Sequence, residues 1–157
     1  MRRAAVICYV TALHVLTLVM LWRWPNPPSH VDRMQAIHAH VDATVPDGAA
    51  LFLGDSHTQR LAVAAVTDRA VNFGIGWQQA SELRLPASVS RARAVYLLVG
   101  TNDLITGTDP LPHLRRIASQ IDAPLVWTGI PPIQGKAQPV NAEIRRLCAE
   151  HPSCTYV

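Results

Sequence analysis

Charged residues, aromatic residues and cysteines are all scarce in this chain of 157 residues. Charged residues make up 16% of it, aromatic residues 6%, and there are three cysteines. Three basic residues, Arg2, Arg3 and Arg23, account for the formal net charge of +3, because the other 11 Lys and Arg residues equal the 11 Asp and Glu residues in number. A domain without a clustered basic face cannot neutralise many phosphates, which argues against nucleic acid as a partner.

Metal-ligand patterns, phosphate-binding glycine loops, internal repeats and low-complexity tracts are also missing, so we expect no cofactor and no metal. Cys148 and Cys154 are accompanied by none of the further ligands that a zinc site needs. They form a disulfide in an oxidising compartment, or they are two small buried side chains, and the sequence leaves both alternatives open.

One long apolar run, residues 4–22, contains no formal charge and has close to the roughly 20 residues that a bilayer-spanning helix needs. The alternatives are a cleaved signal peptide and a buried helix, but bulky residues follow the run and arginines flank it. We therefore predict a membrane anchor over residues 1–23, through which the chain binds the membrane. The excess of arginine before the run places the domain on the extracytoplasmic side, periplasmic or extracellular.

A proline-rich linker over residues 24–29 is expected to lead into a single domain over residues 30–157. Ser29 is the predicted N-cap of a helix in which Val31, Met34, Ile37 and Val41 share one face. Beyond this helix, apolar runs of strand length alternate with helical patterns, which is typical of an α/β fold with a parallel sheet flanked by helices. The predicted strands are 49–53, 70–72, 94–99, 125–128 and 154–157, and the predicted helices are 59–66, 79–85, 110–121 (opened by Asp109) and 140–150.

Three polar clusters follow the first three predicted strands. They are Gly54, Asp55 and Ser56; residues 72–77; and residues 100–103. Ligands of open α/β sheets bind outside the carboxyl ends of the strands, so the three clusters are expected to share one pocket. Taken singly, each cluster is also explained as a helix cap or a turn.

In their order and spacing these clusters resemble three of the four motif blocks of the SGNH/GDSL hydrolase superfamily. The resemblance implies an SGNH/flavodoxin-like three-layer sandwich and a serine esterase in which Ser56 is the nucleophile. It also implies that Asn102 and the backbone N–H of Ser56 donate hydrogen bonds to the oxyanion. A third donor comes from Gly76 or Trp77: the usual glycine falls at Trp77, where a required positive φ would disfavour tryptophan. The Trp77 ring is expected either to form a pocket wall or simply to pack.

The fourth block of the family, Asp-x-x-His, is not found downstream of Asn102, so the usual catalytic histidine and aspartate are missing from the sequence. Remaining candidates for the base are His57, His113 and His151. Two hypotheses follow. The first is a C-terminally truncated esterase, or an acyltransferase, acting on a small-molecule or polysaccharide ester of the cell envelope, such as an acetylated carbohydrate or a lipid. The second is a non-catalytic binding or accessory module on a membrane stalk; a purely structural membrane protein would leave the motifs coincidental.

Overall fold

The computed structural model describes residues 11, 13–20, 28–133 and 135–157. Most of the predicted anchor (1–23) and of the predicted linker (24–29) lies outside the described residues. Residues 11 and 13–20 are helical. No helix among the described residues is both long enough and apolar enough to cross a bilayer. The membrane anchor therefore stays a prediction.

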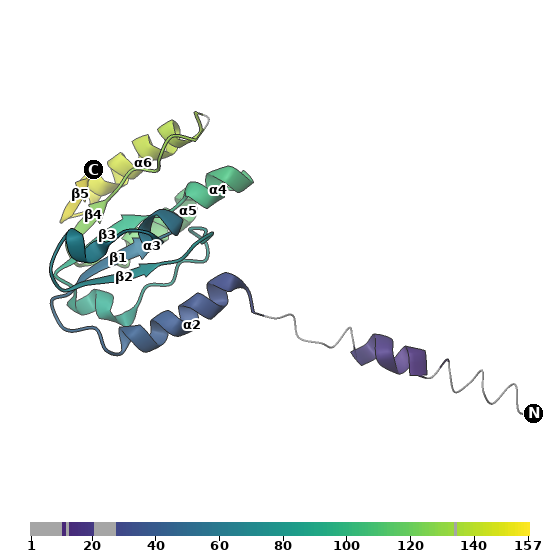
Figure 1. Cartoon of the computed structure of the whole chain (residues 1–157). Helices are drawn as coiled ribbons and strands as arrows, with labels where there is room; N and C mark the ends of the chain where they lie inside the picture. The colour runs from purple at the N-terminus through teal and green to yellow at the C-terminus, as the bar shows by residue number, and fades with distance from the viewer. Residues whose placement is uncertain (1–10, 12, 21–27, 134) are drawn as a thin grey trace, which may run out of the picture.

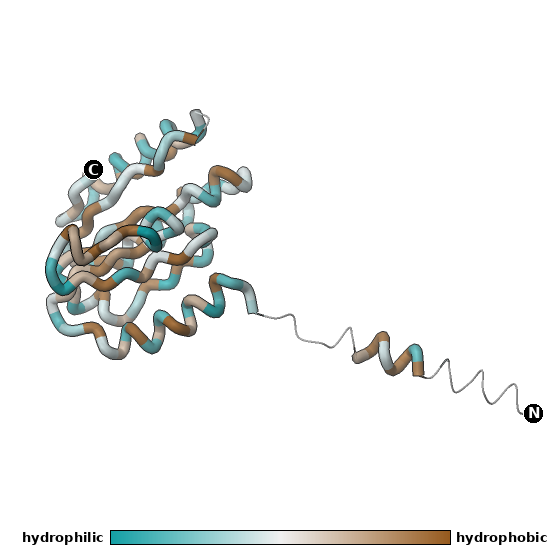
Figure 2. Tube along the Cα trace, in the orientation of Figure 1, coloured by the Kyte–Doolittle hydropathy of each residue, from teal (hydrophilic) through white to brown (hydrophobic). Residues whose placement is uncertain are grey.

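A five-stranded parallel sheet forms the centre of the domain, and this confirms the predicted α/β class (Figure 1). Its strands lie in the order β2-β1-β3-β4-β5. The hydrophobic residues concentrate along the strands at the centre of the domain (Figure 2). The strand bounds are Ala50–Gly54 (β1), Ala70–Gly74 (β2), Ala94–Leu98 (β3), Leu125–Trp127 (β4) and Cys154–Tyr156 (β5).

Helices cover both faces of the sheet. The register aligns Leu53 with Phe73 and with Leu97, and these side chains join the core with residues of α5 (Leu111–Ala118) and α6 (Ala137–Glu150). The opposite face carries Phe52 and Tyr96, whose rings stack with centroids 4.3 Å apart. Because strands alternate their side chains between faces, Asn72 shares this second face, where it contacts the short helix α3 (Ser56–Gln59).

Helix α2 (His30–Asp42) begins where the sequence predicts. Ser29 Oγ accepts a hydrogen bond from the Asp32 N–H at 3.0 Å, and Asp32 accepts one from the Ser29 N–H at 3.2 Å. Such a capping box pairs donors that would otherwise be unsatisfied at a helix start. The predicted apolar face, however, does not turn toward the core: Val31 is buried, but Ile37 is 53% exposed and Val41 37%. Local periodicity predicted the helix correctly but not the face by which it packs.

The helix predicted over residues 59–66 is wrong. Helix α3 ends at Gln59, and only a 3₁₀ turn, Val63–Ala65, follows it. The side-chain amide of Asn72 donates to the carbonyl oxygens of Thr58 at 2.8 Å and of Leu61 at 3.2 Å. These carbonyls would accept the next backbone hydrogen bonds of a continuing helix, so a contact from β2 ends the helix early.

The helix predicted over residues 79–85 is wrong as well, because this segment forms turns. Pro86 has no N–H to donate to the carbonyl oxygen of Glu82, so a helix here could not extend beyond Leu85. That oxygen instead accepts a hydrogen bond from Gln35 Nε2 of α2 at 2.5 Å. The segment continues into a 3₁₀ helix, Ala87–Arg91, whose first two N–H groups donate to the Asp42 carboxylate.

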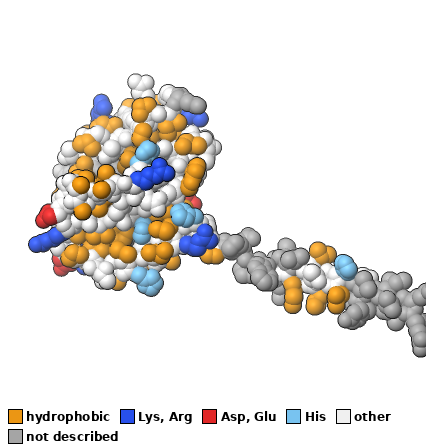
Figure 3. Space-filling view, viewed as in Figure 1, with side chains coloured by type: hydrophobic (Ala, Val, Ile, Leu, Met, Phe, Trp, Pro, Cys, Tyr) orange, Lys and Arg blue, Asp and Glu red, His pale blue; other side chains and the backbone are white. Residues whose placement is uncertain are grey.

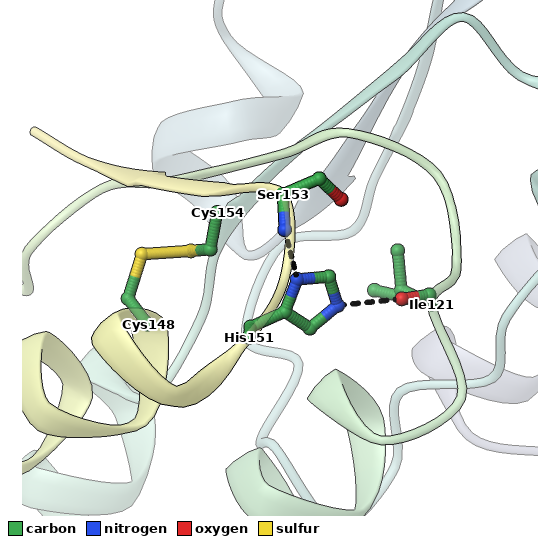
Figure 4. Close-up of a disulfide and its surroundings, with 5 residues drawn as sticks. All are labelled: Ile121, Cys148, His151, Ser153 and Cys154. Carbon is green, nitrogen blue, oxygen red and sulfur yellow. Dashed lines mark hydrogen bonds between the residues drawn. A yellow bond between two sulfur atoms is a disulfide. The ribbon is translucent and has the colours of Figure 1, made fainter.

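Cys148 and Cys154 form a disulfide that joins the end of α6 to the start of β5 (Figure 4). Their Cα atoms are 5.2 Å apart, a separation ordinary for a disulfide. His151 lies inside this corner, where its Nε2 contacts the carbonyl oxygen of Ile121 at 2.7 Å and its Nδ1 accepts a hydrogen bond from the Ser153 N–H. The disulfide alternative of the sequence analysis is therefore the one that the structure contains.

Candidate active site

Ser56 is the first residue of α3, directly beyond the carboxyl end of β1. A Cβ at Gly54 would lie 1.9 Å from the carbonyl oxygen of Leu98, and φ there is +153°, so the strand passes β3 more closely than any side chain permits. Asp55 is fully buried and caps α3, its Oδ1 accepting the His57 N–H at 2.9 Å. Ser56 is partly exposed, and neither its hydroxyl nor its N–H pairs with another described residue. Both groups are thus free to meet a ligand.

The second cluster follows β2 and packs against the first. The side chain of Asn72 is bonded to the backbone of α3, and its Oδ1 accepts the Gly74 N–H at 2.8 Å. A Cβ at Gly74 would lie 2.3 Å from the Gln59 nitrogen, so only glycine allows this approach. The Ile75 N–H then donates to the Gly54 carbonyl at 2.9 Å and ties the two clusters together.

Gly76 and Trp77 form the turn that comes next. Trp77 has φ +66°, the left-handed conformation that glycine adopts most easily. This is the position at which the resemblance to the SGNH/GDSL family places a glycine. The indole is 74% exposed, so the alternative that Trp77 simply packs is wrong. Neither the Gly76 N–H nor the Trp77 N–H bonds to another described residue, and both remain candidate donors.

The third cluster forms the start of α4 (Thr101–Thr106), a short helix that follows β3 and was not predicted. Asn102 is 6% exposed, and its Nδ2 donates to the Gln78 carbonyl at 2.9 Å. One hydrogen of this amide is therefore occupied and the other is free. Asp103 is 1% exposed and its Oδ2 accepts the Ala80 N–H at 2.9 Å. Burial raises the pKa of the Asp103 carboxyl above its ordinary value.

The three clusters therefore gather at one edge of the sheet, over the adjacent strands β2, β1 and β3, as the sequence analysis expected. Gln59 and His30 join them without having been predicted. From the position that a Cβ would take at Gly76, Gln59 Oε1 lies 2.8 Å away and His30 Nε2 4.0 Å away. Gln59 could have been found, because it lies one helical turn beyond Ser56. No signal in the sequence pointed to His30, which belongs to α2.

The three histidines predicted as candidate bases lie at different positions relative to Ser56. His57 is exposed beside it in sequence, and no imidazole among the described residues is hydrogen-bonded to the serine. His113 lies on α5, close enough to Asp103 for its charge to lower the pKa of that carboxyl, though less than burial raises it. His151 lies before β5, next to Ile121 before β4, and thus at the amino-terminal edge of a parallel sheet. It is at the opposite edge from Ser56 and cannot serve as its base.

The surface gives no further electrostatic feature that would define the site. Lys and Arg side chains are dispersed rather than clustered on the face in Figure 3, where histidines and hydrophobic side chains lie among them. Within the described ranges, no three His, Cys, Asp or Glu side chains are grouped so that they could hold a metal ion. The chemistry that this edge can support rests on a serine hydroxyl and a set of N–H donors.

No protein-family model matches the chain, and no curated protein matches its sequence. Solved structures do match its fold. A protein from Streptococcus pneumonia with the provisional name platelet activating factor aligns with a TM-score of 0.69 and 17% identity, over 94% of this chain and 80% of its own. The psychrotrophic esterase EstA from Pseudoalteromonas sp., inhibited by monoethylphosphonate, aligns with a TM-score of 0.51 and 18% identity, over 71% of this chain and 78% of its own. AlinE4, an SGNH-hydrolase family esterase, aligns with a TM-score of 0.46 and 13% identity, over 71% of this chain and 76% of its own. Identities this low show the fold alone, and with the three motifs at the ends of β1, β2 and β3 they show that the chain has an SGNH/GDSL-like fold.

Proposed function

We propose that the chain is a serine ester hydrolase with Ser56 as its nucleophile. The observation that carries the proposal is the gathering of an unpaired serine hydroxyl, the turn at Gly76 and Trp77, and the Asn102 amide at one sheet edge. Ser56 Oγ attacks the ester carbonyl carbon and gives up its proton to a base. The alcohol then leaves with a proton, and water hydrolyses the acyl-enzyme to release the acid and restore the serine.

Negative charge develops on the carbonyl oxygen during both steps, and fixed N–H donors lower the barrier by stabilising it. The candidate donors are the N–H groups of Ser56 and of Gly76 or Trp77, together with the free amide hydrogen of Asn102. Removing one such donor typically lowers kcat by about 10²–10³. Asn102 already has its orientation fixed by the bond to the Gln78 carbonyl, so it needs little reorganisation when the charge forms.

The proposed mechanism requires a base, because a serine hydroxyl without a base is a poor nucleophile. His57 is exposed beside Ser56 and is the candidate within the described residues. A second candidate function is therefore a binding module that uses the same three clusters without catalysis. It is favoured by the one observation that no described imidazole is hydrogen-bonded to Ser56.

The proposed substrate is an ester of the cell envelope, an acetylated carbohydrate or a lipid. Support comes from the sequence: the apolar run over residues 4–22, flanked by arginines, would anchor the domain to a membrane and expose it on the extracytoplasmic side. This location is part of the proposal.

The test combines labelling by a fluorophosphonate with hydrolysis of p-nitrophenyl acetate and butyrate by this chain. The expected result is one covalent adduct, mapped to Ser56 by mass spectrometry, and turnover that is lost in Ser56→Ala. Ser90→Ala is the matched control, since Ser90 is an exposed serine in the 3₁₀ helix before β3. Asn102→Ala should lower kcat about 10²–10³-fold with a smaller change in KM.

The two candidate functions give different outcomes. Adduct formation and turnover that persist in Ser56→Ala would remove this serine from the mechanism. Absence of both adduct and turnover in the unmodified chain, with acetylated oligosaccharide still bound, would establish the binding module instead.

A further inference from the structure

A second concave site lies beneath α2, away from Ser56. It is a cavity of about 380 Å³, within the roughly 300–1,000 Å³ range of small-molecule pockets. Its apolar lining comes from Leu53 of β1, Phe73 of β2 and Leu83 of the segment before the 3₁₀ helix. We propose that this cavity binds a small neutral amphiphile, an apolar chain or ring that carries one hydroxyl group, with the hydroxyl between Gln35 and Gln78.

The cavity exists because of the face that α2 turns inward. Its apolar residues Ile37 and Val41 point outward, whereas Ala36 and Ala39 line the cavity together with polar residues of the same helix. Two alanines cannot fill the space between a helix and a sheet. A hollow of this size that is lined partly by apolar side chains can hold a small molecule.

Two side chains that line the cavity, Gln35 and Gln78, have amide atoms without a hydrogen-bond partner among the described residues. Gln35 Oε1 is buried without a hydrogen bond, although Nε2 of the same amide donates to the Glu82 carbonyl. Gln78 is 2% exposed, lines the cavity, and its side-chain amide pairs with none of the described residues. An unpaired buried amide oxygen is unfavourable, so a ligand that donates to Gln35 Oε1 is favoured there. A hydroxyl can both donate to Gln35 Oε1 and accept from the Gln78 amide, and both residues line the same cavity.

The other polar groups of the cavity favour a neutral ligand. Burial lowers the pKa of His38, whose ring packs edge-on against Phe73, and so favours the neutral form of this imidazole. Asp42 is already bonded to the N–H groups of Ala87 and Ser88. Asp32 is bonded to Ser29 and, with Asp42, opposes the entry of an anion. Among the charged residues that line the cavity, only Arg84 would favour an anion.

The cavity also borders the turn that carries two of the candidate oxyanion donors. Ile75 and Gln78 line it, and they flank the turn of Gly76 and Trp77. The Gln78 carbonyl accepts the Asn102 amide. A molecule in the cavity thus braces the loop that carries the candidate oxyanion donors.

The experiment titrates 1-octanol into the ¹⁵N-labelled chain and follows the side-chain amide signals of Gln35 and Gln78 by NMR. Saturable shifts of both signals are expected, and Ala39→Leu, which fills the cavity, should weaken the Kd about tenfold or more. Ala43→Leu is the matched control, because Ala43 caps the end of α2, is exposed and lies outside the lining. Gln35→Met, which keeps the volume but removes the acceptor, should weaken 1-octanol binding several-fold.

Three results would overturn the proposal. They are the absence of any saturable shift, which would mean a cavity filled by water; an equal Kd in Ala39→Leu and Ala43→Leu; and tighter binding of octanoate than of 1-octanol, which would contradict a neutral ligand. None of these readouts uses ester hydrolysis, so this proposal and the proposed function fail independently.

Discussion

Replacing Trp77 by glycine is expected to give a more stable protein than replacing it by alanine. Trp77 has φ +66°, where the Cβ of an L-residue crowds its own carbonyl oxygen at a cost of roughly 1–2 kcal/mol. Glycine escapes this strain, but the greater entropy of its unfolded chain offsets about 0.4–1 kcal/mol. The indole is 74% exposed, and both variants lose the same few contacts. Trp77→Gly should therefore exceed Trp77→Ala by about 0.5–1 kcal/mol in the free energy of unfolding.

Urea unfolding followed by circular dichroism measures this difference, which corresponds to about 0.3–0.5 M in the midpoint for an m-value near 2 kcal/mol/M. Gly48→Ala is the control at a remote site, since Gly48 has φ +71° and no atom lies within 4 Å of the Cβ position. The free energy of unfolding of Gly48→Ala should fall by the same amount by which that of Trp77→Gly exceeds that of Trp77→Ala. The reasoning is refuted if Gly48→Ala is destabilised as expected while Trp77→Ala equals or exceeds Trp77→Gly.

Three further predictions concern the framework of the domain. Gly74→Ala should lower the free energy of unfolding by about 3 kcal/mol, because the new Cβ would lie 2.3 Å from the Gln59 nitrogen; an unchanged urea midpoint would contradict that close approach. Reducing the Cys148–Cys154 disulfide, a separation of 6 residues, should cost about 2 kcal/mol by loop-closure entropy, and equal melting curves with and without reductant would count against it. Burial raises the pKa of Asp103 above 3.8, so its contribution to stability is fully present below pH 3.8 and is lost as pH rises through the folded-state pKa. Asp103→Asn keeps an acceptor for the Ala80 N–H, so its free energy of unfolding should rise relative to that of the wild type as the pH increases from 3 to 7. A difference in the free energy of unfolding that is independent of pH would disprove the linkage.

Helices and strands that are specified by a few neighbouring residues were predicted well. Ser29 and Asp32 supply both halves of a capping box, so the start of α2 needs no tertiary partner. Residues 94–99 are apolar at every position, as a central parallel strand must be, and β3 lies there. Asp109 accepts the Leu111 N–H at 3.0 Å and opens α5, as expected. The gathering of the three motif clusters also followed from the sequence, because parallel strands place their carboxyl ends at one edge.

Segments whose backbone bonds to distant side chains were predicted poorly. The helical pattern over residues 59–66 was overridden by the Asn72 amide, and in the segment 79–85 the Glu82 carbonyl bonds to Gln35 of α2 instead of to a helical N–H. Hydrophobic periodicity depends only on the residues of the segment itself, so it cannot reveal a hydrogen-bond donor that belongs to another strand or helix. The inward face of α2, and with it the cavity, escaped prediction for the same reason: the helix packs by its small and polar residues rather than its larger apolar ones.

By itself, the sequence determined the fold class and the strand ends at which chemistry could sit, and the resemblance of its motifs to the SGNH/GDSL family pointed to the candidate residues Ser56, Gly76, Trp77 and Asn102. These depend on hydropathy and on motif spacing, which are properties of neighbouring residues. Only the tertiary structure decided that position 77 has a positive φ, that Cys148 pairs with Cys154, and that His151 lies at the far edge of the sheet. Each of these depends on where the packed core holds two segments relative to one another, and that arrangement is set by the whole sheet at once.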